Sequence, residues 1–271
     1  MGRWARVSMV AAGLAMLGNL AGLVWAETVY GREVPAFVQQ AVAQDVVDLL
    51  VVGPALVVLA AGVLRGSDRA WLLWLGALAF TVYNYVIYAF TLHVGRLSLL
   101  WIAVLGLSVA ALGAGLHRLD PEALHWSGRV PRRTVGIFLV VVGALFALLW
   151  LSELLPAVVH GTVPRSAREL GLPANPVHVL DLAFFLPAVI AAGVMVLRRR
   201  PLGLALAPGL LVFLLLTGLP ILLTPVVATV RGEAAAWAVV VPIGVLTLVT
   251  AVVLGRLVST LEVDPARGRR A

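Results

Sequence analysis

Long apolar segments alternate with short polar ones along the whole chain. Eight of the apolar segments are each close to the roughly 20 residues that a helix needs to cross about 30 Å of hydrocarbon. They lie at about residues 6–26, 45–64, 71–93, 98–116, 134–156, 177–197, 202–229 and 236–256. This pattern predicts an all-α polytopic membrane protein with eight transmembrane helices.

The composition agrees with a membrane location. Of the 271 residues, 62% are hydrophobic and only 12% are charged, about half the charged share of a soluble domain. The mean hydropathy is +1.04. No cysteine is present, which excludes disulfides, thiolate metal sites and cysteine redox chemistry.

The net charge of +7 comes from arginine alone, because the chain has no lysine. The arginines lie in short segments between apolar spans and form no basic stripe interleaved with aromatic residues, so we expect no nucleic-acid partner. With the N-terminus inside, the cytoplasmic segments hold Arg3, Arg6, Arg65, Arg69, Arg118, Arg129, Arg132, Arg133, Arg198, Arg199, Arg200, Arg256, Arg267, Arg269 and Arg270. The outer loops hold only Arg32, Arg96, Arg165, Arg168 and Arg231.

This bias predicts that both termini are cytoplasmic. A composition rich in Arg, Ala and Gly is typical of GC-rich bacterial genomes, so we expect a multi-pass protein of a bacterial cytoplasmic membrane. Tryptophans are predicted to mark the span ends at the headgroup layer, namely Trp4, Trp25, Trp71, Trp74, Trp101, Trp150 and Trp237.

Residues 45–66 and 178–199 are similar when the chain is shifted by 133 positions. An Asp, a Pro six residues later and an Arg at the exit coincide, as Asp48, Pro54 and Arg65 fall on Asp181, Pro187 and Arg198. We therefore predict an internal duplication of four helices. The predicted units are a first repeat at 1–116, a cytoplasmic linker at 117–133, a second repeat at 134–257 and a cytoplasmic tail at 258–271.

Four helices per unit is an even number, so both units enter the membrane from the same side and the repeats are predicted to be parallel. An alternative for the first segment is a cleaved signal peptide, since Arg3 and Arg6 precede an apolar run that ends at Ala26. The repeat favours a retained helix, because the equivalent of residues 6–26 lies in the middle of the chain.

Several local features carry further predictions. Residues 34–42 are expected to form a short helix on the outer surface, and residues 117–133 a solvated linker. Pro54 and Pro187 are expected to kink their helices. Gly18 and Gly22 would allow another helix to approach the first span closely.

Polar residues inside the apolar spans are the candidates for function, because burying them is costly unless they have partners. Asp45 and Asp48 open the second span, and His178 and Asp181 open the sixth at equivalent positions. Each pair is spaced i,i+3 and so shares a helix face. Further polar residues in the predicted outer half are Glu153, Tyr83, Asn84 and Tyr88.

Three interpretations of these residues remain open. In the first, Asp48 and Asp181 cap helix N-termini. In the second, a ligand site at the interface of the repeats uses acceptors from several spans, namely Asp48, Asp181, Asn84, Tyr88, Glu153 and His178. In the third, a metal or catalytic centre uses His93, His160, His178, Asp45, Asp181 and Glu153, although their spacing matches no metal-binding motif.

Two segments resemble a known group of proteins. The sequences YNYVIYAF at Tyr83–Phe90 and NPVHVLDLAFFLPA at Asn175–Ala188 are similar to segments of a loosely defined group of bacterial polytopic membrane proteins of unknown function. The resemblance implies the same topology with paired repeats, and it implies no activity.

The favoured function is binding or transport of a small polar solute or ion through an outward-facing polar pocket, with the lipid bilayer as the surrounding partner. The alternatives are a non-catalytic membrane scaffold or sensor subunit and an intramembrane metal-dependent enzyme. The sequence leaves cofactors and oligomeric state open.

Overall fold

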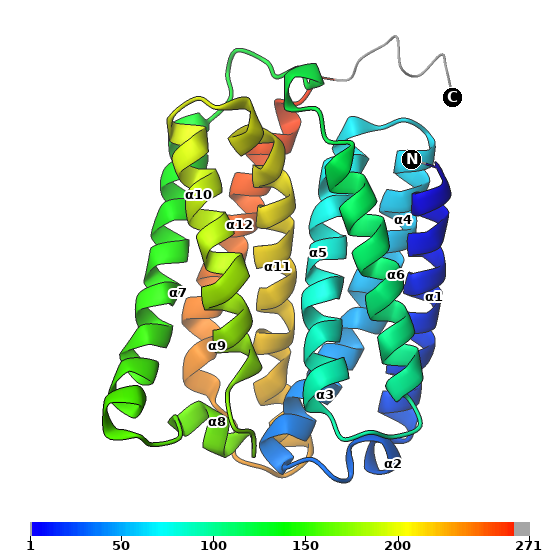
Figure 1. Ribbon diagram of the computed structural model, residues 1–271, viewed down its shortest axis with the longest axis vertical. Coiled ribbons are helices and arrows are strands. Elements are labelled where there is room, and N and C mark those ends of the chain that lie inside the picture. Colours follow the sequence, from blue (N-terminus) through cyan, green and yellow to red (C-terminus); the bar gives the residue numbers. More distant parts are fainter. Residues whose placement is uncertain (1, 263–271) are drawn as a thin grey trace.

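The computed structural model describes residues 2–262, and these residues are helical with no β-strand. Eight helices are long and apolar enough to cross a membrane, which confirms the predicted number. They run side by side as a bundle, with their connections at the two ends (Figure 1). Residues 263–271 of the predicted tail lie outside the described residues.

The eight long helices follow in chain order. They are α1 (Gly2–Val24), α3 to α4 (Pro35–Leu64), α5 (Asp68–Thr91), α6 (Ser98–His117), α7 (Arg132–His160), α9 to α10 (Pro176–Leu197), α11 (Pro201–Val230) and η4 to α12 (Trp237–Ser259). Short helices α2 (Ala26–Tyr30) and α8 (Arg165–Glu169) lie at one end of the bundle, which we call the α2 end (Figure 1). The opposite end holds the start of α1 and the end of α12.

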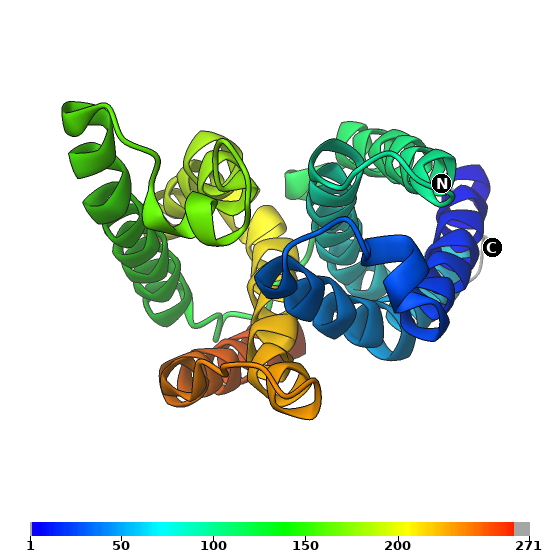
Figure 2. The same ribbon diagram turned by 90° about the horizontal axis from the view of Figure 1, so that it is seen from below.

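The long helices pack as two groups. In the first group α1, α4, α5 and α6 contact one another around a ring. In the second group α7, α10, α11 and α12 form a row, and α7 and α12 meet only marginally (Figure 2). The two groups join where α11 packs on α5 and α3. Large apolar side chains such as Leu17, Val58 and Phe90 are exposed on the outside, as expected for surfaces that face lipid.

Two glycines set the distance between the groups. Gly76 of α5 lies against the backbone of Gly209 of α11, and a Cβ atom on Gly76 would come within 2.2 Å of the Gly209 carbonyl oxygen. Small residues allow helix backbones to approach closely in membranes, where packing drives association. The two glycines are 133 positions apart, the same offset as in the sequence repeat.

The helix predicted to lie on the outer surface is instead the first part of a transmembrane helix. α3 (Pro35–Val47) continues through η1 (Asp48–Val52) into α4 (Gly53–Leu64) without a break. Phe37, Val38 and Ala41 are buried, and α3 packs against α11. The surface-helix prediction was therefore wrong, because the apolar face of this segment is covered by protein.

The two predicted kinks take the form of π-helical turns. η1 begins at Asp48 and η3 (Asp181–Phe185) begins at Asp181, and in each turn the Asp carbonyl accepts the amide hydrogen of the fifth residue along. Pro54 and Pro187 follow directly, within the first turn of α4 and of α10 (Leu186–Leu197). A proline has no amide hydrogen and crowds the carbonyl four residues back, so a wider turn before it relieves the conflict.

The ends of α4 and α10 share a left-handed residue just past the C-cap. Gly66 has φ 78° and Arg199 has φ 56°, and Arg199 is the only non-glycine residue with positive φ in residues 2–262. A side chain in this conformation costs about 1–2 kcal/mol.

We expect Arg199→Gly to raise the free energy of unfolding by about 0.5–1 kcal/mol, measured by thermal unfolding in detergent. Arg198→Gly, at a C-cap with φ −81°, is the control and should give no gain.

The linker at the end opposite α2 is ordered by contacts with the end of α12. Ser127 donates its amide hydrogen to Thr260 O (2.8 Å), Glu262 donates to His125 O (2.9 Å), and Leu124 is buried. His125 and His117 are exposed, so these two side chains are solvated as expected. The prediction of a solvated linker is confirmed for the side chains of His117 and His125. It is wrong for Leu124, which is buried.

The tryptophans predicted at span ends differ in exposure. Trp25 and Trp237 are exposed near helix ends, whereas Trp74 and Trp101, in the first two turns of α5 and α6, are buried within the first group. Trp74 donates its indole N–H to the hydroxyl of Ser8 (2.9 Å). The indole of Trp74 thus has its polar partner inside the bundle.

Candidate functional site

The interior of the first group holds two buried carboxylates. Asp45 is 0% exposed and Asp48 is 3% exposed, and they lie one helical turn apart on the buried side of α3 and η1. The side chains that bond to them come from α2, α3 and α5. We call this set the first polar cluster: Tyr30, Gln44, Asp45, Asp48, Asn84 and Tyr88.

Asp45 is held by two tyrosines. Tyr30 donates its hydroxyl hydrogen to Asp45 Oδ2 (2.7 Å), and Tyr88 donates to Asp45 Oδ1 (2.8 Å). Burial and then the charge of Asp45 raise the pKa of the Tyr30 phenol well above its ordinary value, so this phenol remains a donor. Gly22 of α1 provides the space, because a Cβ atom there would lie 2.1 Å from Asp45 Oδ2.

Asp48 is held by two amides. Gln44 donates to Asp48 Oδ1 (2.8 Å), and Asn84 donates to Asp48 Oδ2 (2.5 Å). Asn19 of α1 lies beside the cluster and accepts a hydrogen bond from Tyr85 (3.3 Å), which stacks on Tyr88. The Nδ2 atom of Asn19 is buried and has no hydrogen-bond partner among the residues that the structure describes.

The first polar cluster contains no basic residue. The ion pairs within residues 2–262 involve Glu27, Glu33, Glu169 and Glu233, and none involves Asp45 or Asp48. Every hydrogen-bond donor to the two carboxylates is neutral. Two buried negative charges without a compensating positive charge are energetically costly, so the cluster is suited to take up a cation.

A second polar cluster lies between α5 and the second group of helices. Asp181 is 8% exposed and accepts hydrogen bonds from Tyr83 of α5 (3.0 Å) and from the indole of Trp150 of α7 (2.8 Å). His178 is 2% exposed and stacks on Trp150 with ring centroids 4.3 Å apart. Glu153, one turn beyond Trp150, accepts the amide hydrogen of Ser166 (2.7 Å).

The predicted ligand residues therefore fall into two clusters and not into one pocket. Asn84 and Tyr88 join the carboxylates of the first cluster, while Glu153 and His178 lie with Asp181 in the second. Asn84 and Tyr83 are neighbours on α5, and neighbouring helix residues point about 100° apart. α5 thus contacts Asp48 with one side chain and Asp181 with the next.

The capping interpretation is wrong for both aspartates. The helix that contains Asp48 begins at Pro35 after Val34, thirteen residues earlier in the chain. The helix that contains Asp181 begins at Pro176, where the Asn175 side chain accepts the amide hydrogen of Val177 (3.0 Å). Both aspartates lie inside continuous helices, so their carboxylates do not meet free amide groups at a helix start.

Gly18 and Gly22 lie on the buried side of α1, but their neighbours are side chains. A Cβ atom on Gly18 would contact Leu100 of α6, and one on Gly22 would contact Asp45 and Tyr30. At Gly22 the missing side chain therefore makes room for the Asp45 carboxylate and not for the backbone of another helix.

The residues of the metal interpretation lie in separate places. His178, Asp181 and Glu153 belong to the second polar cluster and Asp45 to the first. Within residues 2–262 no three His, Asp or Glu side chains are placed to hold a metal ion. His93 is exposed and contacts Glu33 (2.9 Å), and the ring of His160 contacts Pro156 O (2.7 Å). These two histidines lie outside both polar clusters.

Sequence reasoning missed three partners of the aspartates. Tyr30 and Gln44 lie in the segment interpreted as an outer loop, and Trp150 was placed at the headgroup layer. The aromatic and amide side chains near each aspartate were the available signal, but which of them point at the carboxylates depends on how the helices are rotated.

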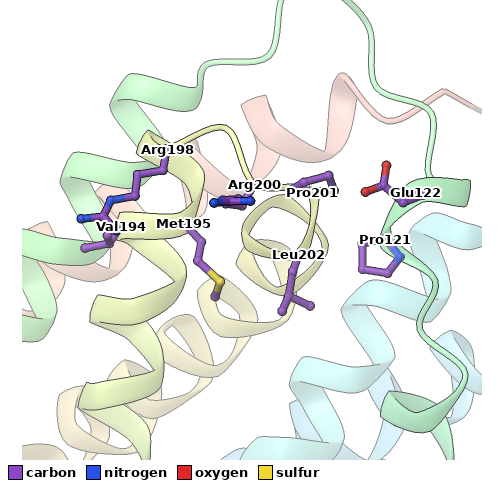
Figure 3. Close-up of a pocket in the computed structure, with 8 residues that line it drawn as sticks. All are labelled: Pro121, Glu122, Val194, Met195, Arg198, Arg200, Pro201 and Leu202. Atoms are coloured by element: carbon purple, nitrogen blue, oxygen red, sulfur yellow. The ribbon is translucent and has the colours of Figure 1, made fainter.

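A pocket of about 360 Å³ lies where α10 ends and α11 begins, and it includes no residue of either cluster. Figure 3 shows its lining residues. It is lined by Pro121, Glu122, Val194, Met195, Arg198, Arg200, Pro201 and Leu202. Its rim is charged and its floor, with Met195 and Leu202, is apolar. A second hollow is apolar and lies over Val10, Met16 and Leu49. Neither corresponds to the predicted outward-facing pocket.

Comparisons with known proteins place the chain in no family. No protein family, curated protein or solved structure matches this sequence or fold. The resemblance of Tyr83–Phe90 and Asn175–Ala188 to bacterial polytopic membrane proteins therefore stays a prediction. What the fold establishes, for residues 2–262, is an all-α arrangement with eight helices suited to span a membrane.

Proposed function

We propose that this protein binds a small monovalent cation, a proton or Na⁺, at the first polar cluster and carries it across the membrane. The observation on which the proposal depends is the burial of Asp45 and Asp48 with only neutral hydrogen-bond donors around them. An intramembrane carboxylate without a basic partner typically marks an ion or proton pathway.

The cost of burying two ionised carboxylates supports cation uptake. Each ionised carboxylate loses its hydration on burial, and neutral hydrogen bonds recover only part of that loss. Asp45 and Asp48 are one helical turn apart on the same face, so their carboxylates repel each other when both are ionised. A bound proton or Na⁺ removes this repulsion, and this gain in free energy favours cation binding at the first polar cluster.

Further polar side chains support a path along the inside of the first group. Thr81, Asn84 and Tyr88 follow one another at i, i+3 and i+7 on α5, so they form one stripe. All three are buried. The Ser8 hydroxyl and the Trp74 indole continue the polar interior toward the opposite end.

We also propose that the chain arose by duplication of a four-helix unit, with both units in the same orientation. Support comes from features at the common offset of 133 positions: the π-helical turns at Asp48 and Asp181 and the facing glycines Gly76 and Gly209. In this scheme Asp48 and Asp181 are equivalent acceptors, and both termini face the cytoplasm of a bacterial cell.

The test uses purified protein in vesicles with an imposed ion gradient. Asp45→Asn and Asp48→Asn should each reduce cation flux at least about tenfold, because removal of the charge removes the cation's partner. Radioactive Na⁺ uptake and a trapped pH dye distinguish Na⁺ from protons.

Asp120→Asn is the control variant, because Asp120 is an exposed carboxylate on the linker. Folded yield is compared by size-exclusion chromatography. Wild-type flux of both ions in the folded Asp45→Asn and Asp48→Asn variants would refute the proposal.

A further inference from the structure

The second polar cluster forms a row that leads inward from the α2 end. α7 runs toward this end and α9 (Pro176–Leu180) runs away from it. From the α2 end inward, Glu153 therefore comes before Trp150 on α7, and His178 comes before Asp181 on the neighbouring helix. Trp150 contacts both His178 and Asp181. Glu153 is half-buried near α8 at the outer end of the row.

His178 is the member of this row without a hydrogen-bond partner. Its side chain is 2% exposed, and its Nδ1 atom is buried with no donor or acceptor in reach among the described residues. A buried polar nitrogen left unpaired is costly, and natural structures usually have a reason for keeping one. Imidazole exchanges protons near neutral pH, which makes an unpaired ring nitrogen suited to proton transfer.

Charged and titratable groups face His178 from each neighbouring element. Glu153 of α7 and Arg165 of α8 are charged groups toward the α2 end, and Glu153 accepts the amide hydrogen of Ser166, the residue after Arg165. Asp181 lies one turn further along the same helix, and Tyr83 of α5 reaches it from the first group. Along the row, Glu153 thus lies toward the α2 end of His178 and Asp181 toward the interior.

We propose that the second polar cluster is a proton-transfer site, in which His178 passes protons between Glu153 at the α2 end and Asp181 in the interior. The imidazole accepts a proton on its free ring nitrogen and becomes imidazolium. It then releases the proton of its other nitrogen to the Asp181 carboxylate, which becomes a neutral carboxylic acid. The site is distinct from the first polar cluster and does not depend on the function proposed for it.

Trp150 provides a direct readout of this site. Its ring stacks on His178, and imidazolium in contact with an indole quenches the emission of the indole. The fluorescence of purified protein is therefore titrated with pH, and the contribution of Trp150 is taken as the difference between wild type and Trp150→Phe. We expect a fluorescence step with pH that is absent from Trp150→Phe and from His178→Gln.

His160→Gln is the matched control, because His160 is also a histidine near the α2 end but lies outside the cluster. It should leave the step unchanged, as should the double variant Asp45→Asn/Asp48→Asn, which separates this site from the first cluster. A step that survives in folded His178→Gln, or that disappears in His160→Gln, would overturn the proposal.

Proton flux into vesicles gives the second measurement. Glu153→Gln and His178→Gln should each slow the flux at least about fivefold when a pH gradient drives it. Flux equal to wild type in both variants, with folded protein confirmed by chromatography, would contradict a proton-transfer role even if the fluorescence step is found.

Discussion

Gly76→Ala is expected to lower the free energy of unfolding by about 3 kcal/mol and to reduce the yield of folded protein sharply. The new methyl group would lie 2.2 Å from the carbonyl oxygen of Gly209 and 2.7 Å from its Cα atom. Both atoms belong to the backbone, so α5 and α11 must move apart to make room. Since these helices join the two groups, the movement disturbs the whole interface. Melting temperature in detergent is the measurement.

The facing glycine is the matched control. A Cβ atom on Gly209 would lie 3.3 Å or more from its neighbours, so Gly209→Ala should cost much less than Gly76→Ala. Gly106→Ala, on the exposed side of α6 with nothing within 4 Å, should be neutral or slightly stabilising because alanine is the better helix former. Equal melting temperatures for Gly76→Ala and Gly106→Ala would show that α5 and α11 are not in backbone contact.

Gly22→Ala is expected to disrupt the first polar cluster, at a cost of about 2–3 kcal/mol. Its methyl group would overlap Asp45 Oδ2 at 2.1 Å and the Tyr30 hydroxyl oxygen at 2.7 Å. Asp45 can escape only by giving up its hydrogen bonds to Tyr30 and Tyr88, which leaves a buried carboxylate without partners. The loss is measured by thermal unfolding, together with cation flux in vesicles.

Gly13→Ala tests the same substitution on the same helix, at a position with open space, and should leave stability and flux unchanged. A double-mutant cycle isolates the contact. If the overlap with the carboxylate is the cause, Gly22→Ala should be much less harmful in an Asp45→Ala background, where the oxygen is gone. Additive effects in the cycle would place the cause elsewhere.

Both polar clusters use one short stretch of α5. Tyr83 and Asn84 are adjacent in the sequence, yet they bond to Asp181 and Asp48 in different clusters. Neighbouring helix residues point about 100° apart, so one helix contributes a side chain to each of two clusters that share no hydrogen bond.

The sequence by itself determined the class of protein and the number of helices. Backbone groups have no water to bond with in hydrocarbon, so each apolar segment must be a helix, and segment length sets the count. The repeated aspartate and proline also located the two distorted turns, because a proline disturbs the turn before it whatever its surroundings. The sequence did not show that residues 35–44 also belong to the second span, since a surface helix and a buried one have similar apolar periodicity.

Only the tertiary structure decided which polar residues meet. The sequence placed Asp48 and Asp181 at equivalent positions, but the rotation of α5 gave one an amide and the other a phenol as its partner. Trp150 bonds to Asp181 because this acceptor lies beside it on the neighbouring helix. Such pairings depend on helix tilt, rotation and spacing, which packing between helices sets and which periodicity along one helix cannot reveal.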